Sequence, residues 1–79
     1  MTTWDIEHTD TFGGEANYSW VQRATIEMPD NATQHQIVRA AKAAIGETGS
    51  RCNTEYYNGD TYQLHYVGRC VTTFIVARY

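Results

Sequence analysis

The stretch that decides the fold is TWDIEHTDTFGGEANYSWVQRATIEM, residues 3–28. Its first part alternates, because Trp4, Ile6 and His8 share one side of an extended chain while polar residues occupy the other. This pattern is typical of a strand with one buried face. The Gly13-Gly14 pair then supplies the positive φ angles that a chain reversal needs. We therefore expect an antiparallel hairpin with an acidic outer face and no catalytic motif in its loop.

The second strand of this hairpin is predicted from Asn17 to Met28. Pro29 ends it, because proline cannot donate to a ladder. After three intervening residues, Thr33 to Gln36 match a capping box with a hydroxyl at the cap and an amide three residues on. They predict the start of a helix.

One amphipathic helix of about three to four turns follows the capping box. Its apolar stripe has helical spacing and consists of Ile37, Ala41, Ala44 and Ile45. Because alanine is small, such a stripe can lie close to a sheet. Arg39 and Lys42 are expected to face away, and Gly46 or Gly49 to end the helix.

The C-terminal third predicts three strands. The first two, 51–57 and 61–67, flank the turn signal Asn58-Gly59-Asp60. Cys70 to Arg78 is apolar on both faces, which places it inside the sheet. The fold class is therefore α+β, with the order ββαβββ, as a single small domain over residues 1–79. Its antiparallel sheet is expected to carry the helix on one face.

Charge is unevenly distributed along a chain whose formal net charge is −3. Residues 1–31 hold six acids against Arg23 alone, whereas residues 32–79 hold more bases than acids. An acidic half disfavours nucleic acid as a direct partner, because phosphate binding needs clustered Lys and Arg. It favours a basic protein surface. For each acid taken alone, the simpler interpretation is that it keeps the face of the hairpin hydrated.

Cysteine and histidine give no signature of a cofactor or metal. Cys52 and Cys70 lack metal-ligand spacing, and a meander would hold them about 10 Å apart, beyond disulfide reach. The three histidines have no second ligand at helical or hairpin spacing, so each is interpreted as buried or capping. Ser and Cys have no neighbouring base. We therefore expect no enzyme activity, no cofactor, no membrane span and a cytoplasmic protein with free thiols.

Binding through the hairpin is the functional hypothesis that these residues favour. Its acids and aromatics form a surface for a protein partner, since aromatics are preferred anchors of protein interfaces. The candidate partner-binding residues are Asp5, Glu7, Asp10, Phe12, Glu15, Tyr18, Trp20 and Glu27.

A resemblance gives this hypothesis a concrete form. The run Asp10–Val21 and the helical run Ile37–Lys42 resemble a group of short proteins from phages and prophages. Small acidic phage proteins of this kind are similar to anti-CRISPR proteins. The resemblance implies an inhibitor that binds a host CRISPR-Cas effector in the bacterial cytoplasm and blocks DNA binding or nuclease recruitment. It transfers no functional residue. Cas surfaces that hold nucleic acid are basic, which fits an acidic hairpin.

Two other functions stay open at this point. The C-terminal tyrosines, with Arg51, Arg69 and Arg78, could form a small nucleic-acid-binding or regulatory module that stacks bases. An enzyme with a non-local catalytic triad is the third. The chain is expected to be a monomer or a homodimer, and the first or third strand to form a sheet edge that could pair.

Overall fold

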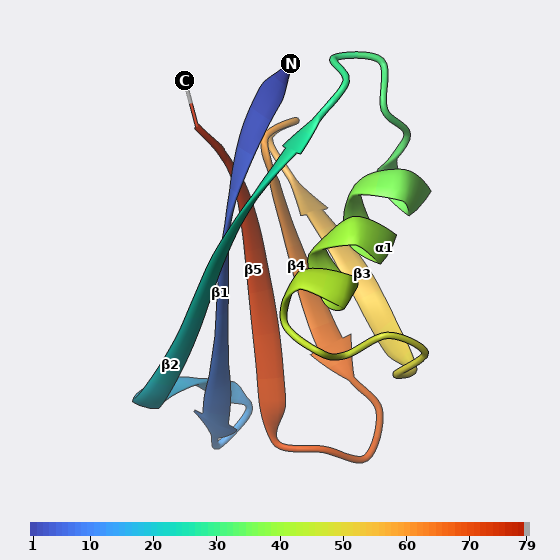
Figure 1. The fold of residues 1–79 in the computed structure, drawn as a ribbon. Coiled ribbons are helices and arrows are strands. Elements are labelled where there is room, and N and C mark those ends of the chain that lie inside the picture. The colour runs from blue at the N-terminus through green and yellow to red at the C-terminus, as the bar shows by residue number, and fades with distance from the viewer. Residues whose placement is uncertain (79) are drawn as a thin grey trace.

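The computed structural model describes residues 1–78, which form one antiparallel sheet with a helix on one face (Figure 1). The elements are β1 (Thr2–Phe12), β2 (Glu15–Met28), α1 (Gln34–Ala44), β3 (Cys52–Tyr57), β4 (Thr61–Tyr66) and β5 (Val71–Arg78). The sheet order is β2-β1-β5-β4-β3. The predicted α+β fold with the order ββαβββ is confirmed.

The last strand, β5, lies at the centre of the sheet, as its apolar character on both faces predicted. It pairs with β1 on one side and with β4 on the other. The remaining pairs are the local hairpins β1–β2 and β3–β4. The sheet therefore consists of two hairpins that β5 joins, and its edges are β2 and β3. Of the two strands expected as a possible edge, the third, β3, is one, whereas the first is not, because β5 pairs with its other side.

The core lies between the sheet and the helix, and the alternation of β1 explains it. Trp4, Ile6 and His8 are all buried on the side that faces α1. Directly across on β5 lies Ile75, which pairs with Ile6. β4 contributes its own alternating set, and the helix adds the rest. The other buried core residues are Ile37, Ala41, Ile45, Tyr62, Leu64, Tyr66 and Ala77.

Both ends of the helix follow the sequence signals. The capping box is complete, because Thr33 Oγ1 accepts from the amide of Gln36 at 3.2 Å and Gln36 Oε1 accepts from the amide of Thr33 at 3.0 Å. Gly46, with φ +77°, follows the C-cap residue Ile45. Ala44, predicted in the buried stripe, is exposed, because the helix faces the sheet through Ile37, Ala41 and Ile45.

Lys42 also differs from the expectation that it faces away. Its side chain is half-buried, and Nζ donates to the backbone oxygen of Ser50 at 2.5 Å. The lysine therefore ties the end of α1 to the loop before β3. No helix among residues 1–78 has the length and apolar character needed to cross a membrane.

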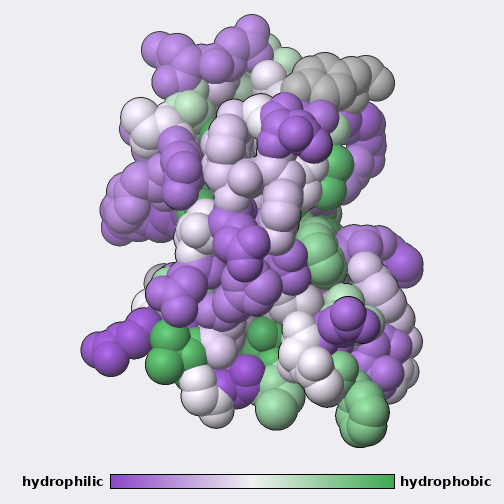
Figure 2. Space-filling view, turned by 180° about the vertical axis from the view of Figure 1, so that it is seen from behind, coloured by the Kyte–Doolittle hydropathy of each residue, from purple (hydrophilic) through white to green (hydrophobic). Residues whose placement is uncertain are grey.

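Figure 2 shows the face of the molecule on the side away from α1. Hydrophilic side chains cover most of it, and hydrophobic ones appear as separate spots. The residues of β1 that alternate with the buried set, among them Asp5 and Glu7, belong to this open face.

Candidate functional site

The end of the β1–β2 hairpin, residues 10–20, is called the hairpin end below. Gly13 and Gly14 form its turn with φ angles of +63° and +85°. The pairing of the two strands is irregular just before this turn: Thr9 lies opposite Val21, but Thr11 lies opposite Ala16. Four residues of β2 therefore stand opposite a single residue of β1, and regular backbone pairing between the strands is interrupted there.

Asp10 fills this gap with its carboxylate. It accepts from the amide of Ser19 at 3.0 Å, from the Ser19 hydroxyl at 2.6 Å and from Asn17 Nδ2 at 2.9 Å. The hydrogen bonds from the side chains of Ser19 and Asn17 lower the pKa of Asp10 from its ordinary value to about 2. Asp10 is therefore charged and fixes the backbone of the loop, and its oxygens already have hydrogen-bond partners within the chain.

Thr9 supports the same loop from the buried side. Its Oγ1 donates to the backbone oxygen of Trp20 at 2.9 Å and accepts from the amide of Tyr18 at 3.1 Å. Tyr18 has a φ of +57°, a conformation that costs a residue with a Cβ about 1–2 kcal/mol. The contacts of Thr9 and Asp10 offset this cost. The hairpin end is therefore held in one conformation rather than left as a flexible loop.

The aromatic residues of the hairpin end differ in exposure. Phe12 is 80% exposed and Tyr18 is 51% exposed. Trp20 is 44% exposed, but its ring lies 5.4 Å from the ring of His8, on the side of the sheet that carries α1. Phe12 and Tyr18 are thus the aromatic side chains available at the tip, while Trp20 covers a buried residue.

The predicted acids do not form one continuous acidic surface. Asp5 accepts from Arg78 Nε at 3.0 Å, and Glu7 accepts from Arg23 Nε at 3.1 Å. The hydrogen bond from Arg78 is the main cause that lowers the pKa of Asp5. Glu27 is exposed near the far end of β2. The structure brings together Asp10, Phe12, Glu15 and Tyr18, and leaves Asp5, Glu7, Trp20 and Glu27 outside this group.

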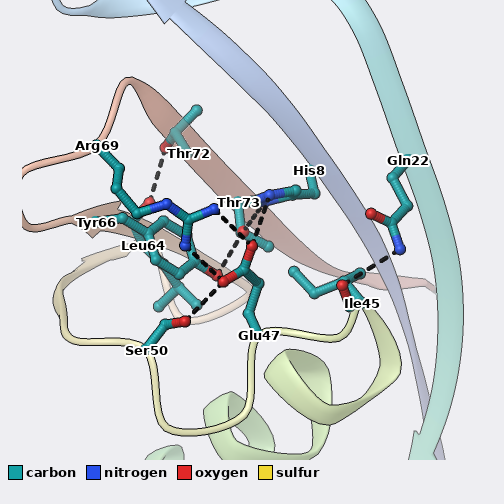
Figure 3. Close-up of polar contacts among 10 residues, drawn as sticks. All are labelled: His8, Gln22, Ile45, Glu47, Ser50, Leu64, Tyr66, Arg69, Thr72 and Thr73. Atoms are coloured by element: carbon teal, nitrogen blue, oxygen red, sulfur yellow. Dashed lines mark hydrogen bonds and ion pairs between the residues drawn. The ribbon is translucent and has the colours of Figure 1, made fainter.

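A buried polar network lies beneath the loop that follows α1, and Figure 3 draws it. Its centre is Glu47, whose side chain is 13% exposed. Arg69 donates to both carboxylate oxygens, at 2.7 and 3.0 Å, and the hydroxyl of Ser50 donates at 2.7 Å. Arg69 first and Ser50 second lower the pKa of Glu47 to about 2.

His8 extends the network into the core. Its Nε2 lies 3.4 Å from Glu47, and its Nδ1 lies 2.7 Å from Thr73 Oγ1. Burial lowers the pKa of His8, although Glu47 opposes the shift. The imidazole is therefore neutral at pH 7. Because a carboxylate only accepts, Nε2 carries the hydrogen, and Nδ1 accepts from Thr73.

This order of carboxylate, imidazole and hydroxyl is the one that hydrolases use to activate a nucleophile. Here the hydroxyl belongs to Thr73, which is 0% exposed, with the Tyr66 hydroxyl 2.9 Å from it. A substrate cannot reach this oxygen without unfolding the core. The network therefore connects β1, the loop after α1 and the turn before β5 through Glu47. Sequence reasoning missed it because Glu47 and Arg69 sit in separate loops with no local spacing.

Tyr62 and Tyr66 belong to the core rather than to an exposed stacking surface. Arg69 and Arg78 are committed to Glu47 and Asp5. A nucleic-acid module built on these side chains would first have to break these contacts. Among residues 1–78, no three His, Cys, Asp or Glu side chains converge as metal ligands would.

Comparison with known proteins gives no match: no protein-family model, no curated protein and no solved structure matches this chain.

Proposed function

We propose that this chain is a non-enzymatic, phage-type inhibitor that binds a host protein complex through its hairpin end. In its most concrete form the partner is a CRISPR-Cas effector, whose DNA binding or nuclease recruitment the protein blocks. One observation carries the binding part of the proposal: Phe12 is 80% exposed at the tip of a loop that an internal hydrogen-bond network holds rigid.

Rigidity matters because association loses free energy to the ordering of mobile segments. The hairpin end needs little further ordering, since Asp10 and Thr9 already fix the backbone of residues 17–20. An exposed aromatic side chain on such a support can fill a pocket on the partner and act as an anchor. Phe12 and Tyr18 are the two residues at the tip that meet this requirement.

Charge adds to the contact in a different way. Glu15 lies directly across from Phe12 and is exposed. Neither hairpin-end acid, Asp10 or Glu15, has a cationic partner among the ion pairs formed by residues 1–78. The oxygens of Asp10 already accept from Ser19 and Asn17, so Glu15 is the acid free to meet a partner. A basic surface on the partner, such as a nucleic-acid channel of a Cas effector, would attract it and speed association. The acids that are already paired contribute through the general field of the hairpin.

The experiment is a tagged pull-down from the lysate of a bacterium with an active CRISPR-Cas system, read by mass spectrometry. The wild-type chain should retain Cas subunits in stoichiometric amount. Phe12→Ala and Glu15→Lys should lose them, because one removes the anchor and the other reverses the free charge. Recovery of nothing, or of nucleic acid alone, overturns the inhibitor function for that system.

Two matched controls separate a local contact from a general effect. Val67→Ala truncates an exposed hydrophobic side chain in a different turn, and Glu27→Lys reverses an exposed acid near the far end of β2. Both should retain the partner. If these controls lose binding as fully as Phe12→Ala and Glu15→Lys do, the hairpin end is not the contact surface.

A further inference from the structure

A groove of about 420 Å³ lies between α1 and β3, at the edge of the sheet opposite to β2. The helix and the strand run in opposite directions along it (Figure 1). From the helix, His35, Arg39 and Lys42 line one wall, and from the strand Cys52 and Thr54 line the other. No carboxylate lines the groove.

The cations of this groove are the ones that the rest of the chain leaves without a carboxylate. The sequence has six Lys and Arg residues. Three of them, at positions 23, 69 and 78, form ion pairs with carboxylates. Within residues 1–78, Arg39, Lys42 and Arg51 form none. Arg39 and Lys42 line the groove, so a chain of net charge −3 carries a local positive patch there.

The strand beside the groove also offers unpaired backbone groups. The oxygen of Arg51 accepts from the amide of Val67 at 3.0 Å, which makes these two residues a hydrogen-bonded pair. Because such pairs alternate along an antiparallel ladder, the backbone groups of Cys52, Thr54 and Tyr56 point away from β4. This free edge presents their N–H and C=O groups on the side where no further strand of residues 1–78 lies.

We propose that the α1–β3 groove binds an extended acidic peptide segment of a partner protein, which adds to β3 as a sixth strand. The backbone groups of Cys52, Thr54 and Tyr56 supply the ladder, as in other cases of strand addition. Alternate carboxylates of the peptide face Arg39 and Lys42, which selects an acidic sequence. Lys42 donates one N–H to the Ser50 oxygen and keeps its other donors for the peptide. Pairing of β3 with a second β3 is disfavoured, because it would bring two sets of like charges together.

The test uses a fluorescein-labelled peptide of eight alternating Glu and Thr residues, titrated with the full chain and followed by fluorescence anisotropy. A peptide of alternating Lys and Thr is the control. The acidic peptide should bind saturably and the basic one should not. Arg39→Gln should raise the Kd about three- to fivefold, as expected for loss of one exposed ion pair. Ala44→Glu changes the net charge equally, at an exposed helix position outside the groove, and should leave the Kd unchanged.

The backbone part of the proposal has its own variant. Thr54→Pro removes an N–H that points to the free edge, a position where strands tolerate proline, and should abolish binding. Should this variant fail to fold, the acidic peptide with alternate amides N-methylated makes the same test on the wild-type chain and should not bind.

Three results would overturn the proposal. Equal binding of the acidic and basic peptides, or absence of binding by both, would show that the groove does not select an acidic peptide. Binding that survives N-methylation would show that the peptide does not pair with β3 as a strand. Self-association that Thr54→Pro abolishes would assign the edge to a second copy instead. Phe12→Ala should leave peptide binding intact, so failure here is distinguishable from failure at the hairpin end.

Discussion

Asp10 and Glu47 are two carboxylates with the same chemistry and opposite consequences. Each accepts several hydrogen bonds, and these lower the pKa of each to about 2. The partners of Asp10 come from within the hairpin end, in an exposed position. The partners of Glu47 come from β1, from its own loop and from the turn before β5. One carboxylate shapes a loop, whereas the other joins distant parts of the chain.

This difference separates function from stability. A network closed within one hairpin can hold a binding tip rigid, with Thr9 as its link to the buried part of β1. A network that spans the fold must break when the fold opens, so removing one of its members should lower the free energy of unfolding. Four predictions test this distinction, beginning with the largest effect.

Glu47→Ala should lower the free energy of unfolding by about 2–4 kcal/mol, because it leaves Arg69, Ser50 and buried His8 without their shared acceptor. Urea unfolding followed by tryptophan fluorescence measures this directly. Glu27→Ala is the control, since this exposed acid has no ion pair within residues 1–78, and it should be nearly neutral. A loss in Glu47→Ala no larger than that of the control would contradict the stabilising role of the network.

Acidification should destabilise the protein in two steps. Below the ordinary histidine pKa of 6.5, the unfolded chain binds a proton that buried His8 resists, because its pKa is lowered in the folded state. Between 4.5 and about 2, the unfolded chain protonates Glu47 while the folded chain keeps it charged. Both differences mean that stability falls as the pH falls. We expect the second step to cost at most about 3 kcal/mol, because solvent around the half-exposed Arg69 screens part of the interaction.

The variant His8→Gln isolates the first step. Urea midpoints measured from pH 7.5 to pH 5 should depend less on pH than in the wild-type chain, whatever the absolute stability of the variant. His35→Gln is the control, since this histidine is exposed on α1. An unchanged slope in His8→Gln would show that another group titrates in this range.

Asp10→Ala should act on the hairpin end alone. The amides of Ser19 and Tyr18 should exchange hydrogen faster. Ser19 loses its acceptor, and the neighbouring Tyr18, strained by its positive φ, is no longer held in place through Ser19. Amides of the central strand should be unaffected. Hydrogen exchange followed by NMR tests this, with Asp60→Ala, a change in a separate turn, as the control. Faster exchange throughout the sheet would mean that Asp10 supports the whole fold.

The smallest effect is expected at the open face. Glu7→Gln breaks the exposed ion pair with Arg23, and such pairs contribute about 0.5 kcal/mol or less. Urea unfolding should show a small loss of stability at low salt, and the loss should shrink further at high salt, because salt screens exposed charges. A loss as large as that of Glu47→Ala would remove the distinction between exposed and buried carboxylates.

Local signals predicted the elements of this fold with good accuracy. The alternation of Trp4, Ile6 and His8 predicted the buried face of β1, and the capping box at Thr33 predicted the start of α1. The Asn58-Gly59 turn formed where expected, with positive φ at both residues. Each of these signals acts within a few residues, so a single sequence is enough to detect it.

The site was harder to predict, because its geometry depends on contacts between segments that are distant in the sequence. Phe12 and Tyr18 were expected to be exposed, and they are. The structural role of Asp10 follows from the irregular pairing of the two strands, which the sequence pattern does not reveal. The meeting of Glu47 with Arg69 follows from the placement of β5, which brings the turn before it beside the loop after α1.

The central position of β5 has a consequence for synthesis on the ribosome. The two hairpins precede it in the chain, and each can form as soon as its own residues emerge. They cannot join into one sheet until β5 follows, because only this strand pairs with both of them. Until then each hairpin exposes an unpaired strand. During translation these five strands therefore exist first as two separate hairpins, and β5, the last of the five to be made, completes the sheet.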